Sequence, residues 1–282
     1  MKQQHADYQV VPYPKIRRWM AAMFRSVQHK PMIHGLIEVD VTRARAFLRD
    51  HQAKTGESLS FTAFLIACLA KAVDENKCVQ AFRKGRKHLV LFDDVDVATM
   101  IERDMAGQRQ PIAYTIRAAN RKTFREIPHE IRAAQVEDVA KALEGMGIKA
   151  SLILPIFLSR FLMMWMPRYP QLLKKYRGTV EVTAVGMFGK GAGWGIPPAT
   201  PTLAITVGGI GEKPGVVDGH IAIREYLSLT ISFDHEMIDG APAARFTQRL
   251  KDLIESGYDL PDSTVASEKA VASVAPGTSK KS

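Results

Sequence analysis

The sequence predicts an α/β fold, a two-layer sandwich with a mixed sheet. Strand-like and helix-like segments alternate along residues 14–260, with several antiparallel hairpins among them. The clearest unit begins at Leu227, from which apolar and polar residues alternate up to Asp234, as in a strand with one apolar face. Pro242 then suits the first turn of a helix. The apolar stripe of that helix consists of Phe246, Leu250, Leu253 and Ile254.

The first third of the chain contains elements of both kinds. Apolar residues recur at helical spacing after Pro14, and residues 61–73 are apolar almost all round, which is typical of a buried helix. Thr42 has the residue type of a helix N-cap. The predicted elements are a helix over 16–27, a strand over 33–41, a helix over 42–53, the buried helix, and two strands within 81–97 that flank the basic turn 83–87.

The rest of the chain continues the alternation. A long helix is expected from Thr123, with Pro128 as a bend or break. The predicted strands are 112–116, the strand around Thr183, 202–210 and 221–233, and the last helix ends near Gly257. The apolar segment 145–170 is unusual. Its most lipophilic part, Leu152–Met166, is shorter than the ~20 residues that a membrane span needs. Its methionines suit core or subunit packing, a pocket for a bulky acyl chain, or contact with a membrane or partner.

Composition limits the class of protein. A chain of 282 residues with 46% hydrophobic content can form a substantial core. The net charge of +10 suggests an anionic partner but does not choose among a phosphorylated cofactor, an acidic carrier protein, nucleic acid and a membrane surface. Cys68 and Cys78 lack the spacing of a zinc site and are too few for a disulfide framework, so a reducing cytoplasm is the default expectation. Residues 1–13 lack the apolar core of an export signal, and residues 261–282 are expected to be a disordered tail.

Two sequence motifs carry the functional information. Asp234, His235, Asp239 and Gly240 form the pattern Asp-His-x-x-x-Asp-Gly, and Gly178–Gly189 reads GTVEVTAVGMFG. These motifs resemble those of the catalytic domain of dihydrolipoamide acyltransferases, the core enzymes of 2-oxoacid dehydrogenase complexes. Chloramphenicol acetyltransferase shares the His-x-x-x-Asp-Gly part. Further segments that fit the resemblance are Arg17–Met20, Glu38–Thr42 and Ile196–Pro198.

The resemblance runs from about residue 8 to residue 257 and implies a chloramphenicol-acetyltransferase-like fold that is usually trimeric. It implies that His235 is the general base, and a strand end is a rigid place to hold one. Imidazole, with a pKa of ~6.5, can accept a proton from a thiol of pKa ~8.5 near neutral pH. Thr183 is implied as the hydroxyl donor to the oxyanion, with the two groups coming from neighbouring subunits. Residue type alone would make Thr183 an ordinary strand residue.

The same resemblance assigns supporting roles. Asp239 is implied to be structural, pairing with Arg17, or alternatively Arg18, to hold the histidine loop. Gly240 is expected at a turn where a Cβ would be costly. A metal site at His235 and Asp239 is not expected, since two ligands do not make a zinc site.

Coenzyme A is the implied co-substrate, with Gly186 and Trp194 as candidate binding positions. The implied reaction is direct transfer of an acyl group from coenzyme A to a thiol, hydroxyl or amine acceptor. No lipoyl group is expected on this chain, so the partners would be a homotrimer or multiple of trimers and a lipoyl domain or carrier protein on another chain. No nucleic acid partner is expected. The family often has Asn before its Pro-Pro pair, whereas Gly195 and Ile196 stand there in this sequence.

Two other hypotheses remain at this point. The chain could be a non-catalytic assembly core that has kept the fold, although retention of His235, Thr183 and Asp239 argues against this. It could also be a membrane-docking or partner-docking protein that uses the surface of residues 152–166.

Overall fold

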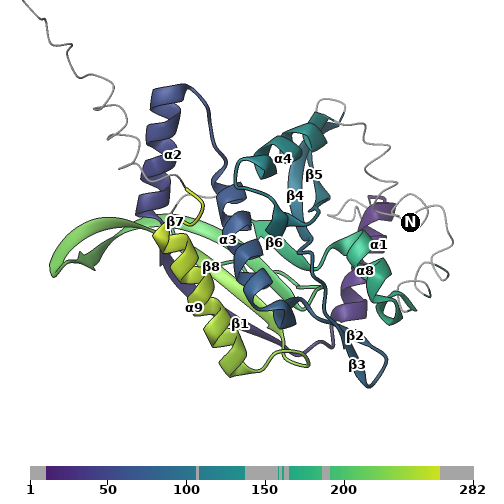
Figure 1. The fold of residues 1–282 in the computed structure, drawn as a ribbon. Helices are drawn as coiled ribbons and strands as arrows, with labels where there is room; N and C mark the ends of the chain where they lie inside the picture. The colour runs from purple at the N-terminus through teal and green to yellow at the C-terminus, as the bar shows by residue number, and fades with distance from the viewer. Residues whose placement is uncertain are drawn as a thin grey trace, which may run out of the picture.

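The computed structural model describes residues 11–105, 108–136, 158, 161, 165–185 and 191–260 (Figure 1). The predictions for residues 1–10, for most of segment 145–170, for Gly186 and for the tail 261–282 lie outside these residues. Among the described residues, no helix is both long and apolar enough to cross a membrane.

The elements follow the predicted order, except that strand β4 (Val97–Met105) and helix α8 (Pro170–Arg177) were not predicted. The helices are α1 (Lys15–Val27), α2 (Thr42–Thr55), α3 (Phe61–Glu75), α4 (Glu126–Val136), α8 (Pro170–Arg177) and α9 (Gly240–Ser256). The strands are β1 (Met32–Asp40), β2 (Phe82–Lys84), β3 (His88–Val90), β4 (Val97–Met105), β5 (Gln108–Ile116), β6 (Val180–Ala184), β7 (Leu203–Val217) and β8 (His220–Asp234).

Six of these strands form one mixed sheet in the order β1-β8-β7-β6-β4-β5. Strand β6 runs parallel to both β4 and β7, and the other neighbours in this sheet are antiparallel. Helices α3 and α9 lie against one face of the sheet, while the β7–β8 hairpin projects beyond them (Figure 1). The predicted two-layer α/β sandwich with a mixed sheet is therefore confirmed.

The core lies between the sheet and the helices. Leu229, Ile231 and Phe233 of β8 are almost fully buried in this core. The polar residues between them, Ser228, Thr230 and Ser232, are almost fully buried as well, so neither face of this part of β8 is open to solvent. The Phe233 ring meets Phe246 of α9 edge to face, with 5.8 Å between ring centroids. Helix α3 is apolar on nearly every side because it is buried by α9 and the sheet, and Ser60 caps it by accepting a hydrogen bond from the Ala63 N–H.

The predicted N-cap of α2 is wrong. The N-cap is Val41, and Thr42 is the first helical residue. The Thr42 hydroxyl donates to Asp40 at 2.6 Å and accepts from the Glu225 N–H at 2.8 Å. The Thr42 hydroxyl therefore bonds to Asp40 and to the distant Glu225 and does not cap the N–H groups of the helix.

A glycine-rich crossing covers part of the sheet face opposite the helices. Gly193 bridges to Gly209 of β7, and its N–H donates to the Ser228 hydroxyl at 3.1 Å. A Cβ on Gly209 would lie 1.9 Å from the Gly191 carbonyl oxygen, so only glycine permits this approach. The Trp194 indole N–H donates to the Ile37 carbonyl at 3.1 Å, which anchors the crossing segment to β1.

Candidate active site

Strand β8 delivers His235 to a tight, hydrogen-bonded turn. The His235 N–H donates to the Pro31 carbonyl at 2.8 Å, which ties the turn to the start of β1. The Asp234 carbonyl accepts from the N–H groups of Met237 and Ile238 at 3.0 Å each. His235 is thus presented from a backbone that is fixed on both sides.

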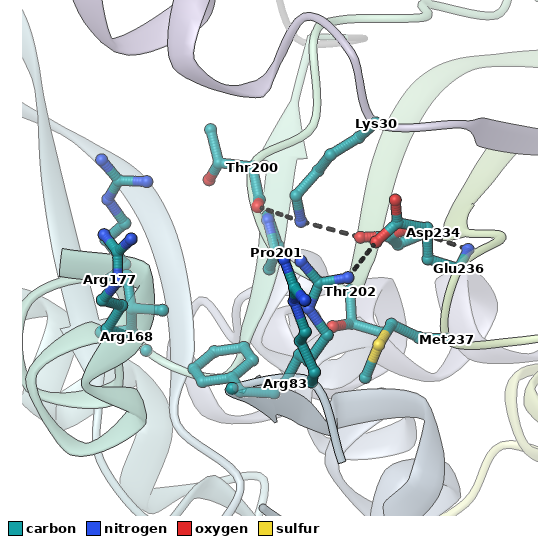
Figure 2. Close-up of a pocket in the computed structure, with 15 residues that line it drawn as sticks. Lys30, Arg83, Arg168, Arg177, Thr200, Pro201, Thr202, Asp234, Glu236 and Met237 are labelled. Atoms are coloured by element: carbon teal, nitrogen blue, oxygen red, sulfur yellow. Dashed lines mark hydrogen bonds and ion pairs between the residues drawn. The ribbon is translucent and has the colours of Figure 1, made fainter. Parts of the chain in front are cut away.

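The side chain of Asp234, the residue before the histidine, stabilises this turn. Its carboxylate is buried and pairs with the Lys30 ammonium at 2.9 Å, while its other oxygen accepts from the Glu236 N–H at 3.1 Å. Lys30 also donates to the Thr200 carbonyl at 3.1 Å (Figure 2). The sequence offered no periodic signal for Lys30, because its partners lie about 170 to 204 positions away along the chain.

The His235 imidazole is accessible, with 43% of its side chain exposed. Its Nδ1 lies 3.7 Å from a carboxylate oxygen of Asp239, four residues further along the chain. This distance is too long for a hydrogen bond but short enough for an ion pair when the ring is protonated. Since Asp239 is 85% exposed, it leaves the ring free to meet a substrate.

The predicted pairing of Asp239 with Arg17 or Arg18 is not seen among the described residues and stays a prediction. Arg17 is exposed and its carbonyl accepts from the Tyr13 hydroxyl at 3.2 Å; no contact among the described residues joins Arg17 or Arg18 to Asp239. The expectation for Gly240 is wrong in this protomer. Gly240 opens α9 without a positive φ, and a Cβ there would meet nothing within 4 Å.

Thr183 does not lie near His235 within one protomer. Thr183 of β6 is opposite Thr206 of β7, which is opposite Thr230 of β8. His235 therefore lies five residues further along β8 and two strands across, roughly 17 Å along the strands and about 10 Å across them. A site that contains both groups can form only between protomers.

A charged cluster that the sequence analysis did not single out surrounds Thr183. Glu181, two residues earlier on β6, accepts hydrogen bonds from the hydroxyls of Thr200, at 3.2 Å, and Thr183. Burial raises the pKa of the Glu181 carboxyl, even though these hydrogen bonds and the nearby Arg177 favour its ionised form. A glutamate between Val180 and Val182 of a buried strand was the available signal for this cluster.

Replacement of Glu181 by glutamine is expected to stabilise the fold at neutral pH by on the order of 1 kcal/mol. Because the pKa is raised on folding, the wild-type carboxyl is at its least costly below its unfolded pKa. As the pH rises from the unfolded pKa through the folded pKa, the carboxyl lowers the stability of the wild-type protein. The gain in Tm of Glu181→Gln over wild type should therefore be larger at pH 8 than at pH 4.

Thermal unfolding across this pH range measures the effect. Glu212→Gln, which neutralises an exposed glutamate on β7, is the matched control and should show no such trend. A Glu181→Gln protein that loses stability mainly at high pH would contradict the assignment of a costly buried charge.

Of the two candidate positions for coenzyme A, Gly186 and Trp194, the structure describes only Trp194. Trp194 is 44% exposed and already uses its N–H on Ile37, so only its ring face is available to a ligand. Within the described part of the chain, no group of three or more His, Cys, Asp or Glu side chains could hold a metal ion.

Comparison with known proteins identifies the family. The model of the 2-oxoacid dehydrogenases acyltransferase catalytic domain matches residues 5–146 and 174–260, which leaves out much of the unusual segment 145–170. The chain is 26% identical over 254 residues to the lipoamide acyltransferase component of the branched-chain alpha-keto acid dehydrogenase complex of Bacillus subtilis. This alignment covers 87% of the chain and 52% of the relative. This chain is also 29% identical over 238 residues to the acetyltransferase component of the pyruvate dehydrogenase complex of Zymomonas mobilis. That second alignment covers 82% of the chain and 46% of the relative. The chain thus spans about half the length of these curated relatives.

Solved structures agree on the fold. A probable dihydrolipoamide acetyltransferase from Listeria monocytogenes superposes with a TM-score of 0.65 at 23% identity, over 89% of this chain and 96% of that one. The dihydrolipoamide acetyltransferase of Azotobacter vinelandii superposes with a TM-score of 0.64 at 22% identity, over 89% of this chain and 93% of that one. With most of its length matched by the family model, this chain belongs to the family of 2-oxoacid dehydrogenase acyltransferase catalytic domains.

Proposed function

We propose that this protein is a coenzyme A-dependent acyltransferase in which His235 is the general base and Thr183 of a neighbouring protomer stabilises the oxyanion. The observation that carries this proposal is the accessible imidazole at the end of β8, held by a braced turn that leaves it 43% exposed. Such a ring can reach a substrate without rearrangement of the backbone.

Residue spacing supports these roles. The structural study of the Azotobacter vinelandii enzyme concerns a serine, a histidine and an asparagine in its catalytic mechanism, with the histidine 52 positions after the serine and four before the asparagine. In this chain His235 lies 52 positions after Thr183 and four before Asp239. A threonine keeps the hydroxyl of serine, and an aspartate replaces the asparagine.

The separation of Thr183 from His235 within one protomer supports a trimeric assembly, as does the exposed apolar surface. Val216, Ile221 and Ile223 on the projecting β7–β8 hairpin are 77%, 82% and 75% exposed, and Leu36 on β1 is 50% exposed. Clusters of such residues are typical of subunit interfaces. The similar pyruvate dehydrogenase core structure is a cubic assembly, which is in keeping with this proposal.

The proposed reaction is a direct acyl transfer. His235 takes a proton from the acceptor, whose thiol, hydroxyl or amine then attacks the thioester carbonyl carbon. The new bond to the acceptor forms as the carbonyl becomes an oxyanion, which accepts a hydrogen bond from Thr183. The carbon–sulfur bond then breaks, and the proton on His235 passes to the departing coenzyme A thiolate. Thr183 must turn its hydroxyl away from Glu181 to serve in this step.

We infer that the acceptor is a lipoyl group on another chain or another carrier thiol, and that the protein works in the cytoplasm. The names of its relatives as lipoamide and dihydrolipoyllysine-residue acyltransferases support the first inference. The free Cys68 and Cys78 are compatible with a reducing compartment and support the second.

Incubation with dihydrolipoamide and acetyl-, succinyl- or branched-chain acyl-coenzyme A is expected to yield S-acyl-dihydrolipoamide and free coenzyme A. The acyl groups are those named for the family's relatives. Mass spectrometry of the acceptor identifies the transferred group directly. A trimer that transfers none of these groups to dihydrolipoamide, cysteamine or a small alcohol or amine would favour the non-catalytic assembly core instead.

A further inference from the structure

A cavity of about 490 Å³ lies beside the turn that carries His235. Its walls come from α8 and the residues before it, the β2–β3 turn, residues 200–202 and residues 234–237 (Figure 2). We call it the arginine pocket, because it is lined by Arg83, Arg86, Arg168 and Arg177. Figure 2 shows Arg168 and Arg177 on the wall opposite Asp234 and Glu236.

The arginine pocket has an excess of positive charge. Five cations, the four arginines and Lys30, face only two acids, Asp234 and Glu236. Both acids are already paired: Asp234 with Lys30 at 2.9 Å, and Glu236 with Arg83 at 3.1 Å. The other three arginines form no ion pair with a carboxylate in the part of the chain that the structure describes.

One of these three guanidinium groups is held by an aromatic ring, and a second is buried. Arg168 lies over the Trp165 ring, 5.0 Å from its centroid. Burial lowers the pKa of the Arg177 guanidinium, an effect that the attraction of Glu181 does not offset. A bound anion would relieve that cost, and guanidinium groups bind carboxylates and phosphates through paired hydrogen bonds.

The pocket also has apolar walls, formed by Phe82, Leu173, Pro201 and Met237. A concave site that combines apolar walls with a few converging cations suits a small molecule. Inorganic anions would leave the apolar walls without contacts.

We propose that the arginine pocket binds a small organic anion, with its carboxylate or phosphate group on the arginines and its hydrocarbon part on the apolar walls. His235 lies on the same turn as the pocket residues Asp234 and Glu236, which brings the bound anion to the turn that carries the proposed general base. We infer further that the anion is a charged group of the acceptor that His235 deprotonates, and this step rests on the proposed function with a carrier thiol, not an uncharged lipoyl amide, as the acceptor.

Isothermal titration with phenyl phosphate, phenylacetate and the neutral phenylacetamide tests the site. At least one of the two anions should bind with a millimolar or tighter Kd, and phenylacetamide should bind at least about tenfold more weakly. The preferred anion distinguishes phosphate from carboxylate ligands. Equal affinity for all three, or no binding by either anion, would overturn the proposal.

Two double variants, each lacking two positive charges, test whether the anion binds in the arginine pocket. The Arg86→Ala/Arg168→Ala double variant removes two exposed pocket cations and should raise the Kd of the bound anion at least about tenfold. Lys84→Ala/Lys87→Ala removes two exposed cations from the same β2–β3 hairpin that do not line the pocket, and should leave the Kd within about twofold. Equal losses in the two double variants would mean that only general charge attracts the anion.

The site and its role in the reaction can fail separately. Binding should persist in His235→Ala, because His235 does not line the pocket, and it should persist even if no acyl transfer is found. In the transfer assay, the bound anion should inhibit competitively with the acceptor and not with acyl-coenzyme A. Competition with acyl-coenzyme A alone would overturn the assignment to the acceptor.

Discussion

Replacement of His235 by alanine is expected to lower kcat for acyl transfer by about 10³-fold, while the protein keeps its fold and oligomeric state. General base catalysis by a placed imidazole contributes ~10²- to 10⁴-fold. The side chain adds little to stability, because it is 43% exposed and its one ionic partner is an exposed aspartate at 3.7 Å. The backbone hydrogen bond from residue 235 to Pro31 remains in the variant.

Steady-state transfer rates, thermal unfolding and mass measurement in solution separate these effects. His129→Ala is the matched control, since His129 is an exposed histidine on α4. This control should change kcat by less than about twofold. If His235→Ala transferred acyl groups at a rate within about tenfold of wild type, the assignment of the general base would be wrong.

The fold was predictable from the sequence wherever one local pattern determined the structure. The alternation from Leu227 to Asp234 became β8, and the apolar run of residues 61–73 became the buried helix α3. Both patterns identify the type of element without knowledge of distant partners, although the alternation did not predict that the polar residues of this strand are buried too. Thr42 shows the limit of such rules, because Asp40 and Glu225 compete successfully for its hydroxyl.

The site was predictable only in part. The strand end that carries His235 follows from period and turn chemistry, whereas the Lys30–Asp234 brace depends on tertiary contact. The environment of Glu181 was not predicted. Its ionised form is favoured by Thr200 and Arg177, and a strand pattern does not reveal these tertiary neighbours. The expected pairing of Arg17 with Asp239 stays a prediction, because no contact between them is found among the described residues.

The second large effect concerns how the two catalytic groups meet. Thr183→Val should reduce kcat by about 10²- to 10³-fold, the usual loss when one oxyanion donor is removed. His235→Ala and Thr183→Val subunits should restore activity when they assemble together, because each supplies the group that the other lacks. Their separation within one protomer, five residues along β8 and two strands across, requires this outcome if both groups act in one site.

Co-expression of the two variants with different affinity tags allows mixed trimers to be isolated by two successive purifications. In either mixed trimer, a cyclic arrangement places an intact His235 against an intact Thr183 at one of the three interfaces. The expected activity is therefore about one third of wild type, far above that of either parent variant. Mixed trimers no more active than their parents would mean that His235 and Thr183 do not share a site between protomers. The general base could then survive as a role for His235, but the oxyanion would need a donor other than Thr183.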